Sequence, residues 1–343
     1  VGLGLEPGVH IGGQLKAIGG STLCGNGDIF IAEACEFNRS FLNMPSDISV
    51  ILNIEAEHLD CYGTFDKLKE AFHSFANMLP EDGLLIYYEA DAEASDISPN
   101  IRARSESVGI EAGTWHAENV SYNVQGHPSF DVVYKGKSLG RLSLSVGGDF
   151  NIIHALVSLA VLNELGIKSL DKAMTELSDF LGADRRNEKT GVINGINMYH
   201  DYGHNAKEMQ GAISVAKKSG KRLIAVMQPH TYSRFFDFFD DLAECTREAD
   251  ITLVTDICAA REIKGEIAKL RAVDESLLDS ARLVEKMREN GINAYLTRSF
   301  DDCEHWILEN CREGDSVLTM GCGDINDLNI QMQKHHDGIL EDR

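Results

Sequence analysis

Short apolar segments alternate with longer amphipathic ones through the N-terminal part of the chain. Residues 29–32, 50–54 and 83–88 have the length and the β-branched or aromatic composition that are typical of strands. Residues 65–79 repeat their apolar positions with the period of a helix. Strands that alternate with helices predict a parallel sheet with helices packed on its faces.

The pattern then changes to alternating apolar and polar positions. Residues 130–134 and 138–144 are expected to form a hairpin, with Lys135, Gly136 and Lys137 at its turn. An antiparallel extension at the edge of the sheet is therefore expected. Two helices follow, at 151–165, where Gly166 is typical of a helix end, and at 170–180.

A second series of strands and helices begins after residue 180. Its expected strands are 198–200, 223–227, 251–255, 294–296 and 316–320. The sequence thus predicts an α/β protein with two doubly wound domains, a first at 1–180 with an antiparallel edge and a Rossmann-like second at 181–343. From Gln331 onward, with His335, His336 and Asp337, the chain is expected to fray.

Composition narrows the possible partners. The 343 residues include 54 acidic and 32 basic side chains, a formal net charge of -22, which argues against nucleic acid or an anionic membrane surface as a partner. The 8 cysteines are scattered without metal-binding spacing, which favours reduced thiols. No apolar run reaches the roughly 18 residues that a membrane-spanning helix needs. We expect a cytoplasmic protein without membrane insertion.

Polar side chains follow two of the N-terminal strands directly. Glu33 follows one strand, and Glu55, Glu57 and His58 follow the next. If the two strands are neighbours in a parallel sheet, Glu33 and His58 reach one rim, where a carboxylate and an imidazole suit Mg²⁺ or Mn²⁺. The alternative is that these groups cap the helices that follow, with nothing bound.

Candidate ligand-binding side chains also stand near the predicted domain boundary. Asn151 begins a helix after two glycines, so its amide either faces a ligand or caps the helix. Arg185 and Arg186 are either solvated charges or phosphate-binding groups, and in an acidic chain the second reading is favoured.

Two further turns at strand ends carry a high density of functional side chains. Asp201, Tyr202 and His204 lie within one turn, and His230 and Arg234 lie within the next. Capping by Asp201 and packing by Tyr202 are the alternative. Because carboxyl ends of parallel strands meet at one edge, these residues are expected to converge, with Arg234 suited to a carboxylate.

The dispersed motifs, taken in order, resemble the Mur ligase family. The similarity covers 10–13, Glu33, His58, 147–160, 182–191, 201–204, 228–234 and 256–262. The resemblance implies a central ATP-binding domain and a C-terminal amino-acid-binding domain. It implies ATP and Mg²⁺ (or Mn²⁺) as cofactors, and UDP-N-acetylmuramate and L-alanine as substrates that are joined through an acyl phosphate in peptidoglycan precursor synthesis.

The resemblance also implies roles for single residues. Those expected around the nucleotide are Glu33 and His58 as metal ligands, Asn151 at adenine, Arg186 at the phosphates and Asp201 at ribose. Those expected around the amino acid are Tyr202, His204, His230 and Arg234. Glu33, His58, Arg186 and His204 are the expected catalytic residues. Asp256 and Glu262 either contact the ammonium group or order their loop.

The chain departs from the family pattern in one major respect. No Gly-x-x-x-x-Gly-Lys-[Ser/Thr] phosphate-binding motif occurs. Because that motif should precede Val1, the chain is interpreted as an N-terminally truncated ligase, inactive alone. A ligase that recycles muropeptides, a non-catalytic nucleotide-binding fragment and, less favoured, a metal-dependent hydrolase are the alternatives.

Overall fold

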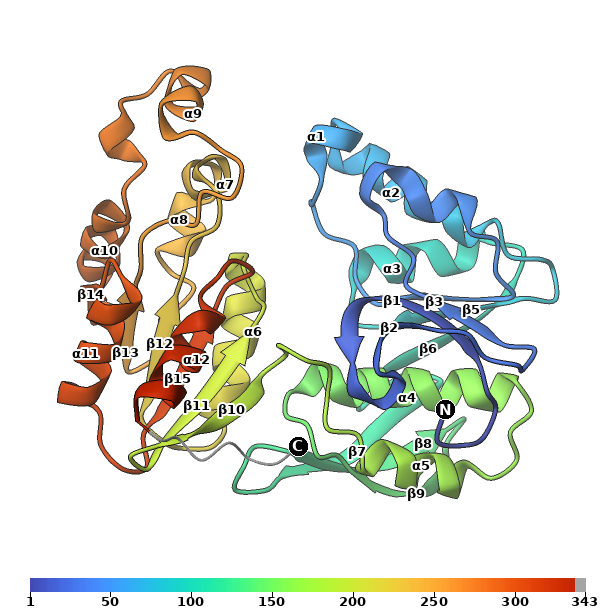
Figure 1. Ribbon diagram of the computed structural model, residues 1–343. Helices are drawn as coiled ribbons and strands as arrows, with labels where there is room; N and C mark the ends of the chain where they lie inside the picture. Colours follow the sequence, from blue (N-terminus) through green and yellow to red (C-terminus); the bar gives the residue numbers. More distant parts are fainter. Residues whose placement is uncertain (337–343) are drawn as a thin grey trace. The chain divides into compact units, whose positions relative to one another are not determined.

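A computed structural model describes residues 1–336, the side chain of Asp60 excepted. The chain divides into two units, one made of Val1–Asn123 and His127–Leu181 and one that begins at Gly182. Each unit is described by itself. Both consist of a largely parallel sheet with helices on both faces, so the predicted doubly wound α/β class is confirmed (Figure 1).

The N-terminal unit contains a main sheet with the strand order β4-β5-β6-β7-β8-β9. Its strands are β4 Ile48–Ile51, β5 Leu84–Tyr88, β6 Arg104–Ile110, β7 Trp115–Tyr122, β8 Pro128–Tyr134 and β9 Lys137–Ser143. The strands β4 to β7 are parallel, and β8 and β9 form the expected antiparallel hairpin. Lys135 and Gly136 both have positive φ, 48° and 74°, as a tight hairpin turn requires.

Side chains alternate across the main sheet because successive strand residues point to opposite faces. Leu84 and Ile86 pack toward α4 and α5, whereas Leu85 packs toward α2 and α3 (Figure 1). The helices are α1 Leu59–Tyr62, α2 Phe65–Ala76, α3 Ala92–Ile97, α4 Asp149–Glu164 and α5 Leu170–Ser178. The helix α4 ends next to Gly166, which has φ 75°, as the sequence predicts.

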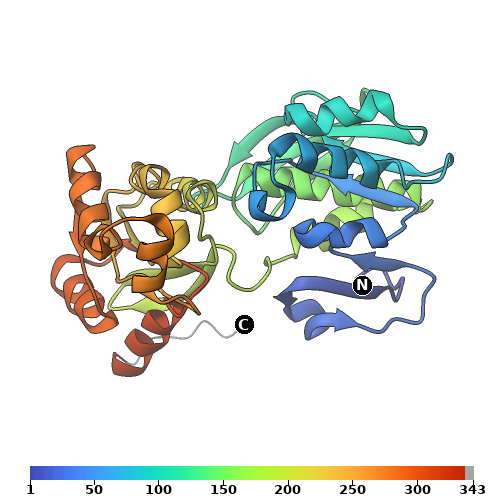
Figure 2. The ribbon, with the colours of Figure 1, turned by 90° about the horizontal axis from the view of Figure 1, so that it is seen from above.

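A separate small sheet has the strand order β2-β1-β3, with β1 Gly8–Leu15, β2 Gly20–Leu23 and β3 Phe30–Ala32. Seen from above, it lies beside the main sheet and is not continuous with it (Figure 2). The expectation that the strands before Glu33 and His58 are neighbours is therefore wrong, because β3 pairs with β1 and β4 pairs with β5. Strand order is set by distant partners, which periodicity alone does not reveal.

The C-terminal unit has a sheet with the order β10-β11-β15-β12-β13-β14. Its strands are β10 Glu188–Ile193, β11 Ile196–Asp201, β12 Leu223–Met227, β13 Ile251–Val254, β14 Ala294–Leu296 and β15 Ser316–Met320. All neighbours are parallel except β10 and β11. The strand β10 was not predicted, because its six residues mix charged and apolar positions without a clear period.

Helices cover both faces of this sheet. One face carries α6 Ala206–Lys217, α7 Tyr232–Asp237, α8 Phe239–Leu242, α9 Lys264–Arg271 and α10 Ser280–Glu289. The other carries α11 Phe300–Asn310 and α12 Asn326–His335. The prediction that the chain frays from Gln331 is wrong through His335, because α12 buries Leu328 and Met332 against the sheet. Asp337 lies outside the described residues.

Candidate functional site

The strand register of the C-terminal unit brings three turns to one edge of its sheet. Asp201 at the end of β11 and Met227 at the end of β12 both align with Met320 at the end of β15. The turns that follow these strands therefore begin at the same level. Ligands of doubly wound sheets bind at this edge, beyond the carboxyl ends of the strands.

Three predicted residues from two of these turns lie together. The rings of Tyr202 and His204 have centroids 5.7 Å apart, and the rings of His204 and His230 have centroids 6.2 Å apart. His204 Nδ1 lies 3.3 Å from Glu208 Oε2 in the first turn of α6. Burial, followed by the charges of His204 and Arg234, lowers the pKa of His230, while Glu262 opposes that effect.

Glu262 orders the first turn of the helix that carries Arg234. One carboxylate oxygen of Glu262 accepts from the backbone N–H of Ser233 at 2.9 Å, and the other accepts from the Ser233 hydroxyl. The Thr231 side chain caps the same helix by accepting from the backbone N–H of Arg234. Of the two readings for Glu262, these contacts support the ordering of the loop.

Asp201 is buried at the end of β11, and its carboxylate accepts hydrogen bonds from two backbone N–H groups, one of them near the start of the C-terminal unit. Its Oδ2 accepts from the backbone N–H of Asn187 at 2.8 Å, and its Oδ1 accepts from Gly203 at 2.7 Å. Burial raises the pKa of Asp201, although these two hydrogen bonds and the charge of Arg186 act in the opposite direction. The Asp201 carboxylate therefore has a structural role, and the predicted ribose contact would be a second role for the same side chain.

The two adjacent arginines have different surroundings. Arg185 is half-buried, lies 4.7 Å from the centroid of the Tyr202 ring, and donates to the carbonyls of Gly321 and Gly323. Arg186 is exposed and contacts the same ring at 5.7 Å. Within the described residues its guanidinium makes no hydrogen bond, so Arg186 is the better placed of the two to bind an anion.

Sequence reasoning missed His200, a fully buried residue of β11. Its Nε2 accepts from Arg185 Nε at 3.0 Å, and its Nδ1 lies 3.0 Å from Thr319 Oγ1. Because Arg185 Nε always carries a hydrogen, Nε2 must be the acceptor and the imidazole must be neutral with its proton on Nδ1. Burial, with the Arg185 charge, lowers the pKa of His200 to about 4.

A pocket of about 390 Å³ opens at the same edge of the sheet. Gln228, Thr255, Asp256, Ile257, Cys258, Ala259, Arg298, Ser299, Phe300 and Asp324 line it. Arg298 bridges Asp256 at 2.7 Å and Asp279 at 3.2 Å, which orders the loop after β13. The sequence indicated Asp256 but gave no signal for Arg298, whose partners lie 42 and 19 positions away.

In the N-terminal unit, the two expected metal ligands have different neighbours. Glu33 is exposed, and its Oε2 accepts from the backbone N–H of Gly12 on β1 at 2.8 Å. A Cβ added at Gly12 would lie 2.8 Å from Oε1, so a side chain there would displace the Glu33 carboxylate. His58 has a positive φ of 56° and places Nε2 3.2 Å from Glu36 Oε1.

Asn151 lies inside the first turn of α4, past the N-cap position, which Gly148 occupies. Its Nδ2 donates to the carbonyl of Gly147 at 2.7 Å, and the N-cap position is Gly148. The side chain therefore tightens the loop before α4, and the capping interpretation is wrong in its geometry. Adenine contact through Asn151 remains a prediction.

The chain matches two domain models of one protein family. The Mur ligase middle domain matches residues 21–162, and the Mur ligase glutamate ligase domain matches residues 185–323. The chain belongs to the Mur ligase family.

Individual relatives support the same assignment. The UDP-N-acetylmuramate–L-alanine ligase of Caldanaerobacter subterraneus subsp. tengcongensis is 37% identical over 327 residues, which cover 95% of this chain and 69% of the relative. Among solved structures, UDP-N-acetylmuramate-alanine ligase MurC from Thermotoga maritima matches with a TM-score of 0.78 at 22% identity, covering 98% of this chain and 70% of that one. A murein peptide ligase from Psychrobacter arcticus matches with a TM-score of 0.65 at 21% identity, covering 99% and 73%.

Across the described residues, the helices are all too short or too polar to span a bilayer.

We predict that His200 makes stability fall in mild acid. Its pKa is lowered from 6.5 to about 4 in the folded state, so the unfolded chain binds more protons between these values. The free energy of unfolding should therefore drop as pH falls from 6.5 toward 4, with a share of about 3 kcal/mol from this residue. Urea titrations at several pH values, for the wild type and for His200→Gln, measure the share by difference.

A matched control is His305→Ala, which removes an exposed histidine of α11. This variant should keep the pH dependence of the wild type. Equal slopes for wild type and His200→Gln would contradict the assignment of a neutral, hydrogen-bonded imidazole at position 200.

Proposed function

We propose that this chain forms the ATP-binding and amino-acid-binding domains of a ligase that joins L-alanine to UDP-N-acetylmuramate. ATP activates the substrate carboxylate as an acyl phosphate, and the amine of L-alanine displaces phosphate to form an amide, with ADP as the second product. The observation that carries the proposal is the 37% identity across 95% of the chain, since it includes both domains. The reaction belongs to cytoplasmic peptidoglycan precursor synthesis.

The C-terminal unit supplies the side chains for the amino acid. Tyr202, His204 and His230 form one side of the proposed pocket, supported by their ring contacts. Arg234 stands on α7, beyond the end of β12, where a guanidinium suits the carboxylate of an amino acid. Burial favours neutral His230, as the direction of its pKa shift indicates, so its imidazole can accept as well as donate a hydrogen bond.

Nucleotide contacts are proposed for residues of both units. Arg186 is exposed and has no hydrogen-bond partner among the described residues, which supports a role at the ATP phosphates. Arg185 is occupied by His200 and two carbonyls, so it positions the loop. Asn151 and Asp201 are the proposed contacts for adenine and ribose.

The residues present fit Mg²⁺ or Mn²⁺ in their chemistry. Glu33 offers an exposed carboxylate that accepts a hydrogen bond from β1, and His58 offers an imidazole that already pairs with a second carboxylate, Glu36. We propose that Glu33 and His58 hold the ion. When bound, it would neutralise charge on the transferred phosphoryl group.

The direct test is ATP-dependent phosphate release with UDP-N-acetylmuramate and each of L-alanine, glycine and L-serine. It is run on the protein from the complete reading frame and on the 343-residue chain. Release that requires the sugar nucleotide and favours L-alanine supports the proposal. A preference for an intact peptide as the amine donor would favour a recycling ligase, and release without added amine would favour a hydrolase.

Substitution of the adjacent arginines should separate structure from binding. Arg185→Ala removes the donor to buried His200 and should lower the free energy of unfolding by about 1–3 kcal/mol. Arg186→Ala should change stability by less than about 0.5 kcal/mol but raise the KM for ATP. Urea unfolding and initial rates with varied ATP provide the two measurements. The reverse pattern would exchange the two roles.

Arg234→Ala should raise the KM for the amino acid by about 10- to 100-fold, because a charged hydrogen bond to the carboxylate is lost. The KM for ATP should change much less. Initial rates with each substrate varied in turn measure both effects. Arg247→Ala, which removes an exposed arginine paired with Glu244, is the matched control and should change neither value. Equal effects of Arg234→Ala on both substrates would exclude a carboxylate-specific role.

A further inference from the structure

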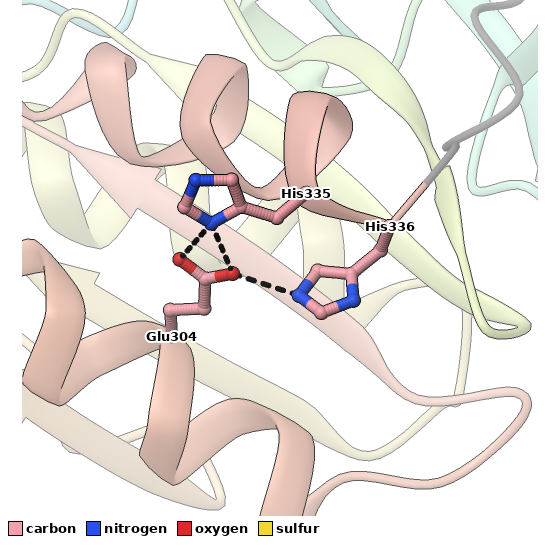
Figure 3. A group of neighbouring side chains, drawn as sticks. All are labelled: Glu304, His335 and His336. Atoms are coloured by element: carbon pink, nitrogen blue, oxygen red, sulfur yellow. Dashed lines mark hydrogen bonds and ion pairs between the residues drawn. The ribbon is translucent and has the colours of Figure 1, made fainter.

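A cluster of metal-ligating side chains joins α11 to the end of α12, apart from the residues assigned above. Glu304 comes from α11, His335 is the last residue of α12, and His336 follows it. The three side chains point toward one another (Figure 3). His335 Nδ1 lies 3.0 and 3.1 Å from the two oxygens of Glu304, and His336 Nε2 lies 2.7 Å from Oε1.

Glu304 carries a carboxylate but is buried. Its side chain is only 10% exposed, and such a group needs partners to remain charged. Besides the two imidazoles, Gln331 Nε2 donates to Glu304 Oε2 at 2.6 Å. Burial raises the pKa of Glu304, but the hydrogen bonds from Gln331, His335 and His336 outweigh it and hold the pKa below its ordinary value. The carboxylate is therefore ionised at neutral pH.

The geometry of the cluster is close to that of a metal centre. Each residue offers one ligand atom, and these atoms all lie within 4.8 Å of one another. In the described part of the chain, it is the one group of three such residues. Tetrahedral Zn²⁺, with bonds of about 2.0–2.1 Å, separates its ligand atoms by roughly 3.3 Å. The carboxylate–imidazole contacts need to open by roughly 0.2–0.6 Å to admit the ion.

We propose that Glu304, His335 and His336 form a binding site for a divalent cation that prefers imidazole ligands, with Zn²⁺ as its type. Three protein ligands leave a fourth position for water. The side chain of His335 is 57% exposed, so an ion can reach the site from solvent and the imidazole has room to change its orientation. The bound ion replaces the hydrogen bonds between the two imidazoles and Glu304 with metal bonds, and it fixes the end of α12 to α11.

The ligand atoms of this site differ from those of the proposed Mg²⁺ site. Two imidazole nitrogens and one carboxylate suit Zn²⁺, Co²⁺ or Ni²⁺, whereas Mg²⁺ and Ca²⁺ favour shells of oxygen ligands. Gln331, which stands one helical turn before His335, holds Glu304 in orientation as an outer partner of the ligand. The inference is independent of the proposed ligase activity, because none of the three residues has a role in it.

The test is a Zn²⁺ titration of the full chain by isothermal titration calorimetry, with Mg²⁺ in a parallel run. His335→Ala and His336→Ala should each lose one bound Zn²⁺ per chain or weaken its binding by at least about tenfold. His305→Ala is the matched control, because His305 also stands on α11, is 73% exposed and lies 3.2 Å from Glu309. The control should bind Zn²⁺ as the wild type does, and the Mg²⁺ run should give the same result for the wild type and for the two histidine variants.

Thermal unfolding supplies a second readout. Zn²⁺ should raise the Tm of the wild type and of His305→Ala but not that of His335→Ala. Because the side chain of His335 is mostly exposed, His335→Ala should fold with nearly the Tm of the metal-free wild type. Zn²⁺ stoichiometry and affinity that are unchanged in both His335→Ala and His336→Ala would overturn the proposal.

Discussion

The hydrogen bond from Arg185 to the buried His200 connects the start of the C-terminal unit to β11, a strand in the interior of its sheet. Arg185 has φ 62° and Asn187 has φ 46°, conformations that cost L-residues on the order of 1 kcal/mol each. Glu188 and Asp201 hold these residues by accepting from their backbone N–H groups. The strained segment persists because several independent contacts fix it. The positions of Tyr202 and Arg186 depend on that arrangement.

An acidic chain must bind anionic substrates through local features. Net charge of -22 repels nucleotides at long range, so short contacts must overcome that field. Arg185 donates hydrogen bonds to carbonyl groups that follow β15 and lies beside the Tyr202 ring. Arg186 remains exposed next to the same ring. Arg185 thus forms part of the structure, whereas Arg186 stays exposed, as its proposed contact with the ATP phosphates requires. The two adjacent arginines therefore differ in role because they differ in burial and in hydrogen bonding.

The sequence predicted most elements because their signals are local. The strands β12, β14 and β15 have the predicted bounds, since each is a short apolar run between turns. What it could not predict depends on contacts between distant residues. The sheet order that separates β3 from β4 is one case, and the burial of His200 beneath Arg185 is another. His335 and His336 were expected to fray, because their partner Glu304 lies 31 and 32 positions earlier.

Thr319 on β15 uses its full hydrogen-bonding capacity. It accepts from His200 Nδ1 and from Asn329 Nδ2, and it donates to the carbonyl of Tyr199. A hydroxyl has one hydrogen and two lone pairs, so all three positions are occupied. Arg185 therefore donates to His200, His200 donates to Thr319, and Thr319 donates to the Tyr199 carbonyl. Because each donor fixes the next, no single hydrogen bond in this series can change its direction alone. Such a chain has a single polarity, and substitutions along it will not add independently.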